Sequence, residues 1–180
     1  NCPDHNYMIS PLYTLAEQAR RNAEDWPSLA SRALRIGVWA LILIGFASRL
    51  SPLADIDGRV FWQFMTEDGY LMQTVARNMA IGLGMSTAEG RIPTNGVQPL
   101  ATFLFAAMQF LAAGSKLAGI GLVTVFSALV SAVAAYYAYK VGKRVFAGLR
   151  HGNELAVLSA ATWFAGPKIV DHSMNGLETG

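Results

Sequence analysis

Segments without a charged residue dominate the hydrophobic pattern of this chain. They include Ile36–Ser48, Val97–Ser115 and Leu117–Tyr139. The hydrocarbon core of a bilayer is roughly 30 Å thick, and about 20 helical residues cross it. The two later segments therefore predict membrane-spanning helices, and the first reaches this length if Arg49 extends its charge to the membrane surface. A further apolar segment, Leu155–Val170, is interrupted by Gly-Pro-Lys and is marginal.

A different pattern occupies residues 68–81. Leu71, Val75 and Met79 recur at every fourth position, which predicts an amphipathic helix with one apolar stripe. The residues expected on other faces are polar: Glu67, Tyr70, Gln73, Thr74, Arg77 and Asn78. We expect Gly82 and Gly84 to end this helix, and residues 85–99 to form a loop back to the membrane. A helix of this kind directly after a span is expected in the membrane interface.

Composition agrees with an integral membrane protein. Hydrophobic residues make up 53% of the chain and charged residues 14%, which is too apolar for an ordinary soluble domain. We therefore expect an all-α fold over residues 32–180, a polytopic membrane helical bundle of three or four transmembrane helices. The amphipathic helix belongs to its first extracytoplasmic loop, at about residues 55–98. Residues 1–31 are polar, and no function is assigned to them.

Charge and cysteine content exclude some functions. The net charge of +2 is spread over loops, so no nucleic-acid partner is expected. The single cysteine, Cys2, excludes an intramolecular disulfide and a cysteine-based zinc site.

Basic residues indicate the orientation in the membrane. One group precedes the first span and a second follows the third segment, and both are expected in the cytoplasm. They are Arg20, Arg21, Arg32 and Arg35, and Lys140, Lys143, Arg144 and Arg150. These expectations conflict if both segments between Val97 and Tyr139 cross the membrane. They agree if only one crosses and the other is re-entrant or interfacial, so sequence leaves the topology of residues 97–180 open.

Four short motifs follow one another along the chain. They are Glu67-Asp68-Gly69-Tyr70, Ala76-Arg77-Asn78-Met79-Ala80 with Gly82-Leu83-Gly84, Thr94-Asn95-Gly96-Val97-Gln98-Pro99-Leu100, and Asn175-Gly176-Leu177-Glu178-Thr179. In order and spacing they resemble GT-C glycosyltransferases, in particular bacterial and archaeal members related to protein O-mannosyltransferases and lipid A aminoarabinose transferases. Two features depart from the family pattern. Glu67-Asp68 stands where relatives often have Asp-Asp or Asp-Glu, and Gly82-Leu83-Gly84 replaces the usual Gly-His-Gly.

The resemblance implies an enzyme of a bacterial or archaeal plasma membrane. It would move a sugar from a polyprenyl-phosphate donor to a glycan, lipid or protein acceptor on the extracytoplasmic face. In the inverting mechanism of the family, one carboxylate removes the acceptor hydroxyl proton while the lipid phosphate leaves. Glu67 and Asp68 are the catalytic candidates, and Asp68 is preferred because a helix N-terminus favours a carboxylate. The same pair is also explained as a helix cap at the interface.

Five further residues are candidates for binding the donor or substrate. They are Tyr70, Arg77, Asn95, Gln98 and Glu178. A guanidinium binds phosphate through two hydrogen bonds, so Arg77 suits the donor phosphate, although an interfacial arginine also extends towards water. Asn95 and Gln98 can bond sugar hydroxyls or cap the following helix. Glu178 is either a site residue or an exposed loop acid, and its motif favours the site.

No cofactor follows from the sequence. A divalent cation is compatible with the acidic pair but is not required, and Asp171-His172 alone provides too few metal ligands. Because the chain begins with Asn1 and ends after a polar cluster, we expect it to be the N-terminal part of a larger enzyme, inactive alone. The alternative is a non-enzymatic membrane scaffold or transporter fragment. Ion-coupled transport is disfavoured because the two later spans lack ionisable residues.

Overall fold

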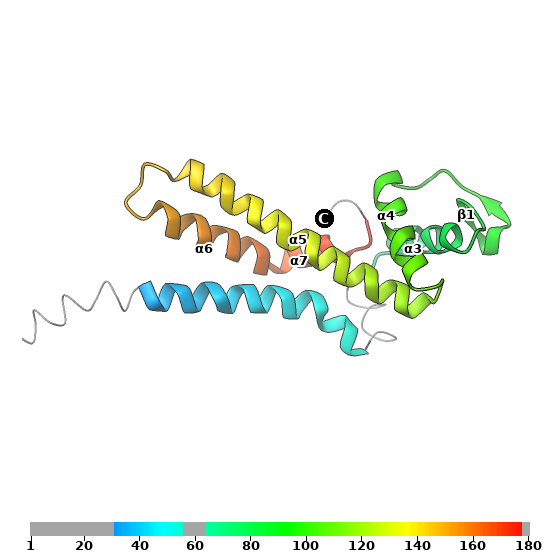
Figure 1. Ribbon diagram of the computed structural model, residues 1–180, viewed down its shortest axis with the longest axis horizontal. Coiled ribbons are helices and arrows are strands. Elements are labelled where there is room, and N and C mark those ends of the chain that lie inside the picture. The colour runs from blue at the N-terminus through cyan, green and yellow to red at the C-terminus, as the bar shows by residue number, and fades with distance from the viewer. Residues whose placement is uncertain (1–30, 56–63, 178–180) are drawn as a thin grey trace, which may run out of the picture. The chain divides into compact units, whose positions relative to one another are not determined.

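The computed structural model describes residues 31–55 and 64–177 (Figure 1). The chain divides into two compact units, Asn1–Trp39 and Ala40–Gly180. Residues 31–39, the described part of the first unit, are helical. The second unit begins with helical residues 40–50 and the 3-10 helix η1, Ser51–Asp55. Its other elements are α3 (Glu67–Ala80), β1 (Ser86–Thr87), η2 (Ala88–Gly90), β2 (Ile92–Pro93), α4 (Pro99–Leu111), α5 (Lys116–Val145), α6 (Gly152–Ala165) and α7 (Pro167–Met174).

Helices dominate the described residues, as the sequence predicts, and the strands are the exception. β1 and β2 are two residues long each and pair antiparallel, with Ser86 opposite Pro93. The segment of residues 85–99 is therefore not a simple loop. Asn78 of α3 holds the hairpin in place, because its side-chain Nδ2 donates to the Ser86 carbonyl oxygen at 2.8 Å.

Two helices are long and apolar enough to cross a membrane. They are Ser31–Asp55, with 25 residues, and α5, with 30 residues. The first contains the charge-free segment 36–48, and the second contains the segment 117–139. These two helices support the membrane character of the chain. The total of three or four spans stays a prediction.

The segment of residues 97–115 does not form a helix of spanning length, which corrects the prediction. α4 has 13 residues, or about 20 Å at about 1.5 Å per residue, and a bilayer core needs roughly 30 Å. The chain then turns at Ala113 and Gly114, whose φ angles are 51° and 72°. The marginal segment 155–170 is likewise divided, because α6 ends at Ala165 and α7 begins at Pro167.

α3 forms where it is predicted, but its buried face is different. Met72, Val75 and Ala76 are buried, whereas Leu71, expected in the apolar stripe, is 39% exposed. Gln73 and Asn78, expected on polar faces, are buried. The buried side of α3 packs against other helices of the protein, and it carries polar as well as apolar residues. Its core contacts form a cluster of Ala76, Ala101, Phe105 and Val123, which joins α3, α4 and α5.

α5 packs against α6 over much of its length (Figure 1). Several buried residues of the two helices are small: Ala128 and Ser131 in α5, and Ala156, Ala160 and Ala161 in α6. Gly142 lies close to α6, because a Cβ at this position would lie 3.2 Å from the Ala156 Cα. Small side chains of this kind allow two helix backbones to approach closely.

Arg49 does not extend to the membrane surface as predicted, because it is fully buried inside the second unit. Its Nη1 donates to the carbonyl oxygens of Gly45 at 3.0 Å and Phe164 at 2.7 Å, and its Nε donates to Ser173 Oγ at 3.2 Å. Phe164 belongs to the last turn of α6, where helix carbonyls lose their partners. The break at Gly166 and Pro167 therefore supplies the acceptor that keeps the arginine buried.

Candidate functional site

The acidic pair lies in the first turn of α3, directly after the helix cap. The cap is Thr66, whose side-chain oxygen accepts a hydrogen bond from the Gly69 N–H at 3.1 Å. Glu67 and Asp68 are both exposed. Because Thr66 does the capping, the acids are not needed for it.

The beginning of α3 contacts the last motif of the chain. The backbone N–H and the hydroxyl of Thr66 each lie 3.4 Å from the Asn175 carbonyl oxygen. Gly69 faces the same carbonyl so closely that a Cβ would collide with it. Gly176 has a φ of 80°, and a Cβ there would lie 3.0 Å from the Gly69 Cα. Both glycines are therefore required by close backbone approach, and two motifs far apart in sequence become neighbours.

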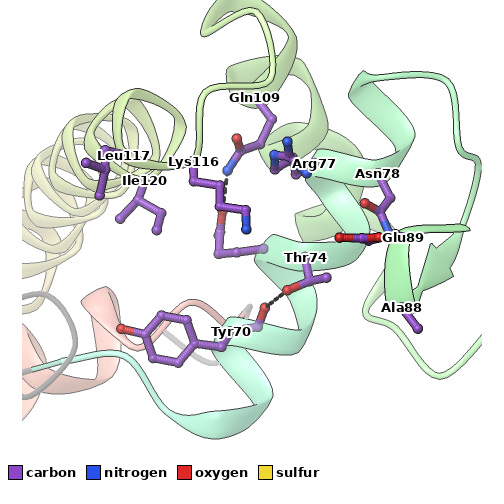
Figure 2. Close-up of a pocket in the computed structure, with 11 residues that line it drawn as sticks. Tyr70, Thr74, Arg77, Asn78, Ala88, Glu89, Gln109, Lys116, Leu117 and Ile120 are labelled. Carbon is purple, nitrogen blue, oxygen red and sulfur yellow. Dashed lines mark hydrogen bonds between the residues drawn. The ribbon is translucent and has the colours of Figure 1, made fainter. Parts of the chain in front are cut away.

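A pocket of about 530 Å³ lies beside α3 (Figure 2). Five residues of α3 line it, together with two residues of η2, Gln109 of α4 and three residues at the start of α5. The polar side chains among them include Tyr70, Thr74 and Asn78, and the charged ones are Arg77, Glu89 and Lys116. The lining is mainly apolar, and these polar and charged groups stand at a few fixed positions in it.

Arg77 connects two sides of the pocket. Its Nε donates to the Gly114 carbonyl oxygen at 2.7 Å, so α3 is fixed to the turn between α4 and α5. This turn also presents Lys116 to the pocket. The lining thus contains two cations from separate elements, and paired cations of this kind bind phosphate groups through charge-assisted hydrogen bonds.

Glu89 brings a carboxylate to the pocket from an unusual backbone conformation. Its φ of 57° and ψ of 41° are left-handed, and the preceding Ala88 has a φ of 47°. A left-handed residue other than glycine costs roughly 1–2 kcal/mol. Such strain is retained where surrounding structure fixes it, and it is concentrated at functional sites.

Two buried glutamines line the same pocket and bond each other. Gln109 Nε2 donates to Gln73 Oε1 at 3.2 Å, and the two residues are 1% and 4% exposed. Gln73 Nε2 and Gln109 Oε1 have no hydrogen-bond partner among the described residues. If oxygen and nitrogen are exchanged in both amides, one donor and one acceptor still lack a partner, because the mutual bond uses only one of each. The pair therefore keeps one donor and one acceptor without a partner, and the Gln109 side chain packs against Gly119 of α5.

Tyr70 lines the pocket one turn after the acidic pair. Burial raises the pKa of its phenol above the ordinary value of 10.0, because the charged phenolate is poorly solvated there. At neutral pH the hydroxyl is therefore protonated.

Helical periodicity distinguishes the two acids. Glu67 precedes Tyr70 by three residues and lies on the pocket-lining side of α3, whereas Asp68 is turned about 100° from it. Neither acid is among the residues that line the pocket. The preference for Asp68 as the base stays a prediction, and helical periodicity alone places Glu67 nearer to the pocket-lining side.

The other predicted site residues are placed differently. Asn95 is exposed, and Gln98 occupies the N-cap position of α4 without a side-chain capping bond. Neither lines the pocket. Glu178 lies outside the described residues. Among residues 31–55 and 64–177, no three His, Cys, Asp or Glu side chains are grouped as a metal site, so the cation stays an open prediction.

Sequence analysis selected Tyr70 and Arg77 as site residues but none of the other residues that line the pocket. Gln73 and Gln109 follow no motif, and Lys116 was only the boundary between two charge-free segments. A charge between two apolar segments marks a turn, which is the one signal that points to Lys116. Glu89 was only one of several loop acids, and nothing in its neighbours indicates its left-handed conformation.

Comparison of the chain with models of protein families, with curated proteins and with solved structures finds no match.

Proposed function

We propose that this chain forms part of a membrane glycosyltransferase that moves a sugar from a polyprenyl-phosphate donor to an acceptor on the extracytoplasmic face. The observation that carries the proposal is the contact between the beginning of α3 and the last motif, the two segments that contain the predicted site acids. Thr66 and Gly69 lie against Asn175 and Gly176, so the acidic pair lies close to the chain that leads into Glu178. Two motifs that only the family resemblance had connected therefore lie next to each other in the structure.

The pocket beside this contact supports the proposal chemically. Arg77 and Lys116 suit the phosphate that links the sugar to its lipid. Gln73 and Gln109 keep an amide donor and an amide acceptor, which suit sugar hydroxyls. Leu117 and Ile120 form an apolar side at the beginning of α5, which is compatible with a polyprenyl chain.

In this proposal, an acid of the α3 N-terminus acts as general base. It removes the proton of the acceptor hydroxyl as the oxygen attacks the anomeric carbon, and the carbon–phosphate oxygen bond breaks. The leaving lipid phosphate takes the electron pair and is held by the cations. Asp68 is the predicted base, and Glu67 is the second candidate because of its position on the helix.

The short α4 also fits the proposed orientation. If α5 alone crosses the membrane after the loop of residues 55–98, the first arginine group and the Lys140–Arg150 cluster lie on the same side. That is the arrangement that the distribution of basic residues favours. The acidic pair and the pocket are then extracytoplasmic, where polyprenyl-phosphate sugars are used by the family.

A transfer assay tests the proposal. Membranes that contain the protein are incubated with radiolabelled polyprenyl-phosphate sugars, and label in an acceptor is measured. Asp68→Asn is expected to lower transfer by at least about 100-fold, because general base catalysis contributes about that much, with membrane abundance unchanged. Asp171→Asn, which removes an exposed acid on α7, is the matched control and is expected to keep full transfer.

Three results would change the proposal. Loss of transfer in Glu67→Gln but not in Asp68→Asn would move the base to Glu67. Wild-type transfer in both variants would remove the pair from catalysis. No transfer from any donor would favour the non-enzymatic scaffold.

A further inference from the structure

The C-terminal end of α5 extends beyond the membrane core. Residues 117–139 carry no charge and span about 34 Å as a helix, slightly more than the core of roughly 30 Å. The last turns of α5 and the turn to α6 therefore lie at the depth of the lipid headgroups. Tyr136, Tyr137 and Tyr139 mark this boundary, as aromatic residues commonly do.

A second pocket, of about 390 Å³, lies at this turn. Lys143 of α5 and Arg150 of the connection line it, together with Phe146 and Leu149. Glu154 is the one acid in the lining. It is also the one acid in residues 90–170 of the sequence, whereas Lys140 and Arg144 add two more cations nearby. The pocket is therefore a local concentration of positive charge.

The turn that carries this pocket is well defined. Tyr139 donates its hydroxyl proton to Asn153 Oδ1 at 3.1 Å, and Lys143 Nζ lies 5.7 Å from the centre of the Tyr139 ring. Gly152 has no space for a side chain, because a Cβ would collide with the Phe146 carbonyl. The cations are therefore presented from a fixed backbone rather than from a loose loop.

Apolar side chains accompany the charges. Val145 and Leu149 are 70% and 56% exposed on either side of Phe146. In water this exposure is unfavourable, but at a membrane surface such side chains contact acyl chains next to the headgroups. A free phosphate ion has no apolar group that could contact these two side chains.

We propose that the pocket at the α5–α6 turn binds the phosphate of an anionic phospholipid headgroup. Lys143 and Arg150 contact the phosphate, and Val145 and Leu149 contact the adjoining acyl chains. The site is separate from the pocket beside α3, which lies at the opposite end of α5 (Figure 1). The proposal depends on α5 crossing the membrane and does not depend on the proposed transferase activity.

Native mass spectrometry of the purified chain in detergent tests this inference. Phosphatidylglycerol is expected to stay bound and phosphatidylcholine to be lost. Each basic residue near a membrane surface contributes roughly fivefold to binding of anionic lipid. The double variant Lys143→Gln/Arg150→Gln is therefore expected to bind phosphatidylglycerol about 25-fold more weakly. Glu154→Gln is expected to bind it more tightly, because it removes the opposing charge.

The controls separate this site from general attraction. Lys168→Gln removes one positive charge from exposed residue 168 of α7, outside the pocket, and is expected to bind as the parent does. Weakening of about fivefold in Lys168→Gln, the share of one charge in the effect of the double variant, would reduce the effect to net charge and overturn the proposal. Displacement of the lipid by millimolar inorganic phosphate would show a site for free phosphate instead. Unchanged binding of phosphatidylglycerol in Glu154→Gln would also contradict the proposal.

Discussion

Arg49 and the Gln73–Gln109 pair are both polar groups buried between helices, yet their hydrogen-bonding groups are used differently. Arg49 bonds two backbone carbonyls and one hydroxyl, and its guanidinium carbon lies 4.2 Å from the Phe164 ring centre. Only its Nη2 lacks a hydrogen-bond partner among the described residues. The glutamines make one mutual bond and keep a donor and an acceptor beside a pocket. A polar group that satisfies backbone at a helix break holds the fold, whereas one that faces a pocket unsatisfied is suited to a ligand.

The largest effect is expected from Arg49→Ala. It removes the partner of the Phe164 carbonyl at the end of α6 and leaves a cavity at the α6–α7 break. We expect a loss of about 3 kcal/mol in the free energy of unfolding, from an unsatisfied buried acceptor and lost packing. Unfolding by heat or denaturant in detergent measures this loss.

Ser173→Ala is the matched control for the arginine. It removes one of the hydrogen bonds of Arg49 and keeps the other two, so it is expected to cost about 1 kcal/mol. If the two variants are equally stable, Arg49 does not hold the helix break, and the first half of the comparison fails.

A smaller effect is expected when both glutamines are replaced. In Gln73→Met/Gln109→Met, donor and acceptor disappear together, and the change in unfolding free energy is expected to stay within about 1 kcal/mol. Gln109→Met alone leaves the Gln73 amide without a partner and is expected to cost about 1–2 kcal/mol. The same unfolding measurement compares them. A double variant as unstable as Arg49→Ala would give the pair a structural role instead.

The smallest effect concerns Tyr70 at high pH. Burial raises the pKa of its phenol above 10.0, so the unfolded chain loses this proton at a lower pH than the folded chain. The resulting stability is fully present below about pH 10 and is lost as pH rises through the folded pKa. Tyr70→Phe is expected to remove the latest component of the phenolate absorbance titration. A titration unchanged by this substitution would show that Tyr70 is not the shifted group.

Sequence patterns predicted the helices whose signals are local. α3 follows from the spacing of Leu71, Val75 and Met79, and α5 follows from its long charge-free segment. The end of α4 was not predictable in this way. Ala112 and Ala113 are as apolar as the helix before them, and hydropathy does not contain the left-handed φ that reverses the chain there.

The position of Arg49 shows a second limit. An arginine near the end of an apolar segment commonly extends to the membrane surface. Its burial depends on a carbonyl set free by Gly166 and Pro167, which are more than a hundred residues further along the chain. The pocket shows the same limit. A local motif indicated Arg77, but Gln73 and Gln109 become neighbours only through the packing of α3 against α4.

The small residues between α5 and α6 have a consequence for how this protein assembles. Alanine side chains bury little area, so in water their contact would contribute little to the attraction between helices. In lipid the hydrophobic effect no longer draws helices together, and van der Waals contact at short distance does so instead. If α5 lies in a bilayer, the close approach of Gly142 to Ala156 therefore contributes more to the α5–α6 contact than the apolar area that it buries.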